Sequence, residues 1–299
     1  MAVYRALSLL EGSYAPTVSR REPYWRPPVP KCTKIVHTPV WNWQSVTKTT
    51  PPVQLIDLDV SGAFLAAASS ALFAHGPLRP TGATPVTGAT GYYLIDAHPW
   101  AGGGIPNPLG TADLKERVWV AHPTLLLLRQ LEDEGYWPAI TIHDSYTAVA
   151  SCRLRRWAER VRDDRAAMLA ARNVAPQDTP EYDAADDAYQ AVKDGYAIAV
   201  QMMLGTTADG QPSKARIKRP DWYHTIHAQH AANHWRKAWK AVLAGHHPAA
   251  MGAVDELTFT ADDLDALLRA DVLPMDETGL KLGSLKTKSI RTLIEENAS

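Results

Sequence analysis

Short apolar segments typical of strands are spread along this chain and are separated by helical segments of unequal length. The strand-like segments lie at residues 53–62, 91–100, 138–150, 253–261 and 279–288, and another strand is expected to lead into a helix within 116–136. Strands so far apart, with helices between them at irregular intervals, do not match a regular winding of parallel strands and helices. The pattern predicts an α+β fold.

Two long amphipathic segments, 152–173 and 186–205, lie on either side of a polar turn and predict an antiparallel helical pair. A third long helix is expected at 226–245, and shorter helices at 61–74 and 262–271. Residues 12–52 are rich in Pro, Trp, Arg and Thr, which predicts an extended and irregular arm.

Composition excludes several classes of protein. Hydrophobic residues make up 45% of the 299 residues, enough to bury a core, so a disordered or fibrous chain is excluded. With 31 Lys and Arg against 32 Asp and Glu, overall charge does not indicate a nucleic-acid partner. Two cysteines are too few for a disulfide framework. No apolar run approaches the roughly 18 residues that a membrane-spanning helix needs, and the N-terminal residues lack the pattern of a signal peptide. We expect a cytoplasmic protein that does not enter the membrane.

Basic residues are nevertheless concentrated in 153–165 and 213–240, the second interleaved with Trp222, Tyr223 and further Trp residues. A nucleic-acid groove and solvated helix faces both explain such runs. Histidines at 227 and 230 have a helical spacing that can bind zinc, but the Glu of a zinc-protease motif is absent. A role in the core or in a DNA groove is therefore favoured for them.

Acidic residues at two strand-like segments are the candidates for metal chemistry. Asp57 and Asp59 are two residues apart, so both side chains would project from one face of a strand. Mg²⁺ prefers such oxygen ligands, although Asp59 or Ser61 can instead cap the next helix. Asp255 and Glu256 interrupt a second apolar strand, where a buried acid needs a partner or a metal. An ordinary turn with exposed acids is the alternative.

Arg162 and Arg165 are three residues apart on one face of a predicted helix, and Lys193 lies on the following helix. Such a face can hold a triphosphate through charge-assisted hydrogen bonds. The alternative is surface ion pairing with Asp163, Asp164 or the acids at 183–187.

Taken in order, these segments resemble the polymerase module of family B DNA polymerases, especially the protein-primed branch. DVSGAFL (59–65) is similar to the first palm motif, which implies Asp59 as a metal ligand and Phe64 as the aromatic gate against a ribose 2′-hydroxyl. AVQMMLG (199–205) is similar to the fingers motif, with Gln201 in place of the usual Asn and Leu204 in place of the usual Tyr. The nucleotide-binding Lys of the family would fall at Ala197, and Lys193 lies one helical turn earlier.

AVDEL (253–257) resembles the third motif, which implies that Asp255 binds both metals, while Ala253 replaces the first Asp. GLKLGSLKTK (279–288) resembles the strand that supports primer DNA. The resemblance covers about residues 53–290, with degenerate motifs. Since no segment resembles a proofreading exonuclease or a normal thumb, a priming protein or second subunit is expected to complete the module.

The resemblance implies an α+β palm with an antiparallel sheet and a helical fingers insertion. The expected parts are an N-terminal arm (1–52), palm (53–150), fingers-like helical pair (151–205), second part of the palm (206–290) and short tail (291–299). The implied function is a minimal template-dependent DNA polymerase or primase-like nucleotidyltransferase of DNA replication. Its expected partners are DNA and deoxynucleoside triphosphates, with two Mg²⁺ (or Mn²⁺) ions about 3.5–4 Å apart. Separately, the high content of Ala, Arg and Trp suggests a source on a mobile element such as a plasmid or phage.

Two alternatives stay open. A catalytically inactive polymerase-like DNA-binding or replication-initiation factor is supported by Ala197, Leu204 and Ala253 at motif positions. A metal-dependent nuclease or phosphotransferase on an unrelated fold would also need paired acids.

The implied site residues fall into three groups. Asp59 and Asp255 are the catalytic metal ligands, supported by Glu256 or Asp57. The nucleotide is expected to contact Phe64, Arg162, Arg165, Lys193 and Gln201. DNA is expected to contact Lys214, Arg216, Lys218, Arg219, Arg236, Lys237, Lys281 and Lys286.

Overall fold

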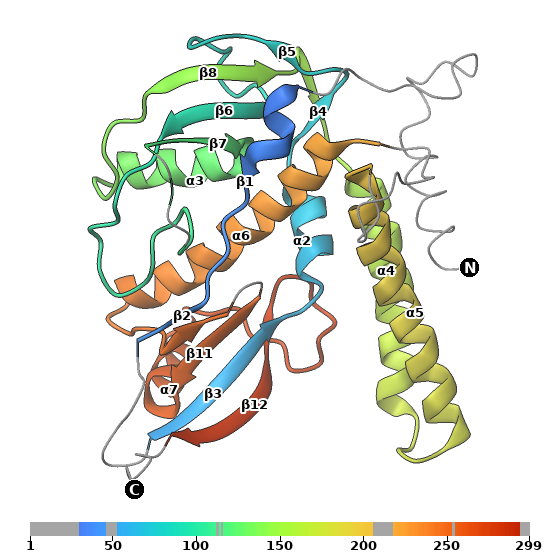
Figure 1. Cartoon of the computed structure of the whole chain (residues 1–299). Helices are drawn as coiled ribbons and strands as arrows, with labels where there is room; N and C mark the ends of the chain where they lie inside the picture. Colours follow the sequence, from blue (N-terminus) through green and yellow to red (C-terminus); the bar gives the residue numbers. More distant parts are fainter. Residues whose placement is uncertain are drawn as a thin grey trace, which may run out of the picture.

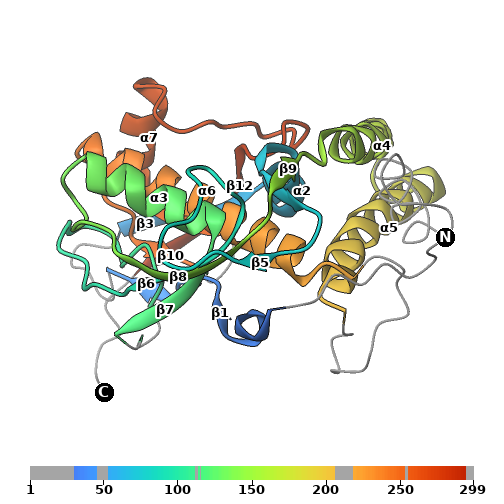
Figure 2. The same ribbon diagram turned by 90° about the horizontal axis from the view of Figure 1, so that it is seen from above.

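The computed structural model describes residues 30–45, 53–111, 114, 116–205, 218–252 and 255–293. The predicted α+β class is confirmed: two five-stranded sheets pack with helices. Helix α6 (Pro220–Leu243) runs between the two sheets, and the pair α4 (Arg155–Val174) and α5 (Pro180–Met203) extends from one side of the molecule (Figures 1 and 2).

Sheet I contains both acidic strand segments. Its order is β12–β3–β11–β10–β2, and all neighbouring strands are antiparallel. The strands are β12 (Leu285–Leu293), β3 (Val53–Val60), β11 (Glu256–Thr260), β10 (Ala250–Met251) and β2 (Trp43–Gln44). The central strand β3 therefore pairs on both sides with strands from the C-terminal part of the chain.

Register explains the alternation of apolar and acidic residues in β3. Leu58 lies opposite Leu257, and Asp59 lies opposite Glu256. Because side chains alternate between the two faces, Leu58 faces the core while Asp59 faces the other side. Helix α7 (Ala261–Arg269) follows β11 and contributes Leu264 to the same core cluster.

Sheet II is a separate layer with the order β1–β7–β6–β8–β5. Its strands are β1 (Val36–His37), β7 (Arg117–Ala121), β6 (Gly91–Asp96), β8 (Ile142–Thr147) and β5 (Arg79–Pro80). β7 leads directly into α3 (His122–Asp133), as the sequence predicts. Figure 1 shows α3 beneath this sheet, between it and α6.

The prediction of an irregular arm at 12–52 is wrong for its described part. Residues 31–35 form a 3₁₀ helix, β1 pairs in parallel with β7, and β2 pairs with β10, so this segment adds an edge strand to each sheet. Trp41 between them is buried, and its Nε1 donates to the carbonyl of Asn107 at 2.9 Å. A strand of two residues is too short to show an alternating pattern in the sequence, so β1 and β2 can be recognised only from their pairing in the structure.

The predicted helical pair is confirmed, but α5 begins at Pro180, earlier than expected. Thr179 caps the helix by accepting a hydrogen bond from the N–H of Tyr182, and Pro180 occupies the first turn, where its missing N–H costs nothing. The negative charge of Glu181 in the same turn interacts favourably with the positive N-terminal end of the helix dipole. The remaining short elements are α2 (Ala63–Ser70), β4 (Phe73–His75) and β9 (Ala150–Cys152).

Helix α6 is largely buried, and its apolar residues belong to the core. Trp222, Trp235 and Trp239 are all buried, so these aromatic rings pack inside the protein rather than being available to stack on DNA bases. Within the described ranges, we find no helix with the length and apolarity that crossing a bilayer requires.

Candidate active site

Asp59 and Asp255, far apart in the sequence, come together where β3 pairs with β11. Asp59 is opposite Glu256 in the register, and Asp255 immediately precedes that residue. Burial, the negative charge of Asp59 and a hydrogen bond with Asp59 raise the pKa of Asp255 to about 6. Two carboxyl groups in one partly buried place repel each other when both are ionised. A bound cation would relieve this repulsion, so the pair fits a divalent metal.

Two lysines of β12 lie beside these acids. The Nζ of Lys286 is 3.6 Å from Oδ2 of Asp59, and the Nζ of Lys288 is 2.5 Å from Oε2 of Glu256. Lys286 is thus next to the carboxylate pair, and Glu256 is already paired with a cation.

The sequence predicted Asp57 as a supporting metal ligand, but the structure places it in a different role. Its buried carboxylate accepts hydrogen bonds of 2.7 Å from both Thr258 and Ser289 and is 3.0 Å from Nε of Arg291. Burial alone would raise the pKa of Asp57, but these donors outweigh burial and hold it below its usual value. Asp57 therefore links three strands of sheet I and is saturated with donors.

Across the described ranges, no group of three or more His, Cys, Asp and Glu side chains is arranged to bind a metal. Neither Asp57 nor Glu256 completes a larger cluster, so the pair Asp59–Asp255 is the core of the candidate site.

A set of unsatisfied hydrogen-bond donors surrounds the turn that follows Asp59. The chain passes through Ser61 and Gly62, which has φ 57°, into α2, whose first turn carries no acidic residue and no side-chain cap. The hydroxyls of Ser61 and Ser284 are buried and, like Nε of Arg165, have no hydrogen-bonding partner among the described residues. Free N–H groups and the dipole at a helix N-terminus attract anions. We call these four residues (Ser61, Gly62, Arg165 and Ser284) the turn cluster.

Arg165 connects the helical pair to this turn. Its side chain is 2% exposed, and its guanidinium donates to the carbonyl of Gly279 at 2.8 Å and to the hydroxyl of Tyr189 at 3.3 Å. Tyr196 of α5 interacts with both Arg165 and Asp255, although burial is the main cause of its raised pKa of about 12. The base of the helical pair therefore lies at the carboxylates.

The other residues predicted to contact a nucleotide differ in burial and in their partners. Phe64 is half-buried at the start of α2, with ring centroids 4.7 Å from His227 and 5.1 Å from His230. Gln201 is half-buried and Lys193 exposed on α5. Arg162 is exposed and lies 2.7 Å from Asp163, which is the surface ion pair considered as the alternative.

Several residues predicted to contact DNA are internal. Arg219, which the sequence analysis expects to contact DNA, is buried, lies 2.5 Å from Asp221 and donates to the carbonyl of Ala74 at 2.6 Å. Arg236 is half-buried and donates to Gln130. Burial, followed by the charge of Lys240, lowers the pKa of half-buried Lys237 to about 8.

The remaining basic residues lie at different depths. Lys281 is exposed, while Lys218 and Lys286 are half-buried. Lys214 and Arg216 lie outside the described residues.

The sequence analysis considered Ser61 only as a helix cap, and α2 has no side-chain cap hydrogen bond. It did not predict Ser61 or Ser284 as donors beside the acids, because serines are common and the two belong to distant segments. A signal does exist for the first, since Ser-Gly directly follows an acid-ended strand and precedes a small-residue helix. Nothing in the local sequence distinguishes Ser284, which reaches the turn because its carbonyl accepts from the N–H of Ser61 at 2.8 Å.

These features define an α+β fold with a carboxylate pair on sheet I, and its likeness to known structures is to DNA polymerases. Among solved structures the chain is similar to Phi29 DNA polymerase complexed with primer-template DNA in a post-translocation binary complex, with a TM-score of 0.62 and 12% identity. It is also similar to the ternary complex with primer-template DNA and incoming nucleotides (TM-score 0.62, 10% identity) and to the complex with single-stranded DNA (0.58, 10%).

In each case the match covers 97% of this chain and 52% of the polymerase, so the chain spans about half the length of these proteins. No family model matches the sequence, and no curated protein matches it. At this identity, the likeness shows the fold.

Proposed function

We propose that this chain is a template-dependent DNA polymerase module, or a primase-like nucleotidyltransferase, of the protein-primed family B type. The observation that carries the proposal is the meeting of Asp59 and Asp255 on paired strands, directly beside the unsatisfied donors of the turn cluster. Carboxylates that bind cations, next to donors that bind phosphate, form the combination that phosphoryl transfer requires.

In this proposal, the palm comprises residues 53–150 and 206–290, which contain most of both sheets together with α6, and α4 with α5 forms the fingers (151–205). The polymerase fold supports the division, as does Arg165, which joins the helical pair to the turn after Asp59 through Gly279. Primer-template DNA and deoxynucleoside triphosphates are the proposed substrates, and a priming protein or second subunit is the proposed partner.

Asp59 and Asp255 would hold the divalent cations, Mg²⁺ or Mn²⁺. When bound, these cations would promote ionisation of the primer 3′-hydroxyl and neutralise charge on the leaving pyrophosphate. In the reaction, the 3′-oxygen forms a bond to the α-phosphorus and the bond from that phosphorus to the bridging oxygen breaks. The chain's own residues position the two reacting groups and supply much of the charge compensation.

The turn cluster would bind the triphosphate. The hydroxyls of Ser61 and Ser284 and Nε of Arg165 would find acceptors in the phosphate oxygens, which would satisfy groups that are otherwise buried without partners. Phe64, held by His227 and His230, would lie against the sugar. Lys286, 3.6 Å from Asp59, would neutralise phosphate charge at the primer end.

The test is incorporation of labelled nucleotides on a primed template with Mg²⁺ or Mn²⁺. Wild type should extend the primer, and both Asp59→Asn and Asp255→Asn should lower the rate at least 100-fold while circular dichroism shows a folded protein. Asp265→Asn, a change of the same chemistry at an exposed position of α7, is the matched control and should retain full activity.

The second candidate is a polymerase-like DNA-binding factor without catalysis. It is favoured by Ala197, Leu204 and Ala253 at motif positions and by the lack of a larger metal-binding group among the described residues. In that case wild type would incorporate nothing under any condition, and DNA binding would be the same in Asp59→Asn and after removal of Mg²⁺.

A further inference from the structure

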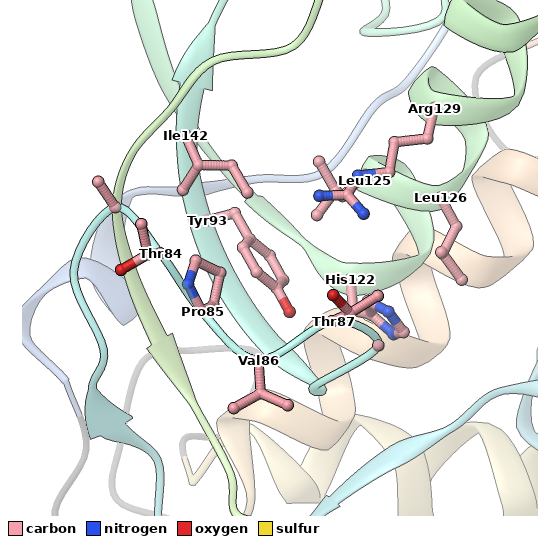
Figure 3. A pocket seen from close by; sticks show the side chains of 12 residues that line it. Thr84, Pro85, Val86, Thr87, Tyr93, His122, Leu125, Leu126, Arg129 and Ile142 are labelled. Atoms are coloured by element: carbon pink, nitrogen blue, oxygen red, sulfur yellow. The ribbon is translucent and has the colours of Figure 1, made fainter.

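A second concave site lies away from the carboxylates, on the α3 side of sheet II. An open pocket of about 270 Å³ is lined by the loop Ala83–Gly88, by Tyr93 and Ile142 of the sheet, and by α3 (Figure 3). Its lining residues include none from the turn cluster or the carboxylate pair. A site here would therefore act independently of nucleotide transfer.

One end of this cavity has a polar side chain. His122, the first residue of α3, is only 4% exposed and lines the cavity, with its ring centroid 6.2 Å from that of Tyr93. Burial, with a smaller effect of the charge on Arg129, lowers the pKa of His122 to about 4. The imidazole is therefore neutral at pH 7 and has one N–H to donate.

The cavity also has a cation. Arg129 is half-buried, and within the described ranges it has no acidic partner within ion-pair distance. Its charge acts on both His122 and Tyr93, so it faces the same space as both rings. Figure 3 shows its side chain extending from α3 toward Tyr93 and Ile142, while His122 and Thr87 lie at the opposite end.

The remaining walls are mainly apolar. Leu125 and Ile142 line the interior, Tyr93 is held in place by donating to the carbonyl of Ala89, and Val86 and Leu126 at the rim are 77% and 44% exposed. An apolar cavity with few convergent polar groups is the usual form of a small-molecule site.

We propose that this cavity binds a small amphipathic carboxylate, with its apolar body against Leu125 and Ile142 and its charge at Arg129. A single arginine matches one negative charge and can bind both oxygens of a carboxylate, whereas a phosphate dianion would need a second cation. The volume is slightly below the roughly 300 Å³ at which drug-sized sites begin, which favours a ligand with one ring or a branched chain.

The experiment uses 3-phenylpropanoate as the probe and 3-phenylpropanamide, its uncharged analogue, as the control ligand. Each is titrated into ¹⁵N-labelled full-length protein, and amide chemical shifts are followed. The carboxylate should bind with a Kd of about 1 mM, the scale expected for a small fragment. Its shifts should be confined to Ala83–Gly88 and α3, and the amide should bind at least tenfold more weakly.

Arg129→Gln should weaken binding of the carboxylate about tenfold and leave the amide unchanged. Arg117→Gln, an exposed arginine on the neighbouring β7 and outside the cavity lining, is the matched control and should bind like wild type. Equal affinity for acid and amide, full binding by Arg129→Gln, shifts spread over the whole surface, or no shifts up to 10 mM would each overturn the proposal.

Discussion

Asp57 and Asp59 share one face of one strand, yet the structure predicts opposite consequences for replacing them. Asp57 is buried and accepts from Thr258 and Ser289, and it pairs with Arg291. Asp59 is partly exposed, lies beside the like charge of Asp255 and is 3.6 Å from one lysine. We therefore expect Asp57→Asn to lower stability and Asp59→Asn to leave it nearly unchanged in metal-free buffer.

The size of the first effect follows from the contacts. A hydrogen bond to a charged group contributes about 1.5–3 kcal/mol. Asparagine keeps one acceptor oxygen but turns an NH₂ group toward the remaining donors, while the 44% exposed side chain of Arg291 can turn to water. A net loss of about 2 kcal/mol is expected for Asp57→Asn. In a protein of 299 residues that corresponds to a fall in Tm of roughly 3 °C.

For Asp59→Asn the loss of the ion pair with Lys286 is offset by relief of the repulsion with Asp255, so Tm should change by less than about 2 °C.

Addition of Mg²⁺ should increase the difference in Tm between the two variants. If Mg²⁺ binds the carboxylate pair with a Kd of about 1 mM, 10 mM Mg²⁺ stabilises the folded state by about 1.4 kcal/mol. Asp57→Asn should retain this gain, and Asp59→Asn should lose it.

The assay is thermal unfolding of wild type and both variants in EDTA and in Mg²⁺, together with primer extension at a temperature where all three are folded. Asp57→Asn should keep most of the extension activity. A normal Tm for Asp57→Asn combined with lost Mg²⁺ stabilisation would refute the reasoning and return Asp57 to the metal ligands.

Three further predictions concern stability. Because partial burial and the nearby His230 and His224 lower the pKa of half-buried His227 from 6.5 to about 4, its contribution to stability is fully present above pH 6.5 and is lost as pH falls toward 4. Wild type should therefore lose about 2 kcal/mol more than His227→Gln between pH 7.5 and pH 5 in urea unfolding, and equal pH slopes would contradict the assignment. Arg219→Met leaves the buried Asp221 unpaired and should cost about 3 kcal/mol, whereas a surface DNA ligand at this position would change salt-dependent DNA affinity and leave Tm unchanged. Gly62→Ala places a Cβ 2.6 Å from Cδ2 of Leu282 at a φ of +57° and should lower Tm and weaken nucleotide binding in fluorescence titrations, so unaltered values would show that the turn is not tight.

The sequence by itself determined the parts of the fold that local periodicity encodes. Alternating apolar and acidic residues in 53–60 predicted a strand with two different faces, and amphipathic spacing predicted the helical pair. Asp59 and Asp255 were also identified from sequence, because an acid that interrupts an apolar segment is unusual enough to require a reason.

Tertiary structure alone decided which of these residues act together. The basic and aromatic segment at 213–240 reads like a surface that binds DNA, yet Arg219 and Trp235 are buried. Arg219 donates to the carbonyl of Ala74, and Trp235 donates to the carbonyl of Pro106 and packs in the core. Composition reports which residue types are present and cannot report which face a neighbouring element will cover.

The same reason separates Asp57 from Asp59. Their spacing places both on one face, but the partners of β3 differ along its length: Thr258 and Ser289 lie opposite Asp57, while Glu256 and Lys286 lie opposite Asp59. These partners come from strands about 200 residues away in the chain. Strand pairing over such a distance depends on the packing of the whole chain, and it is this pairing that makes one aspartate a link between strands and leaves the other available to bind a cation.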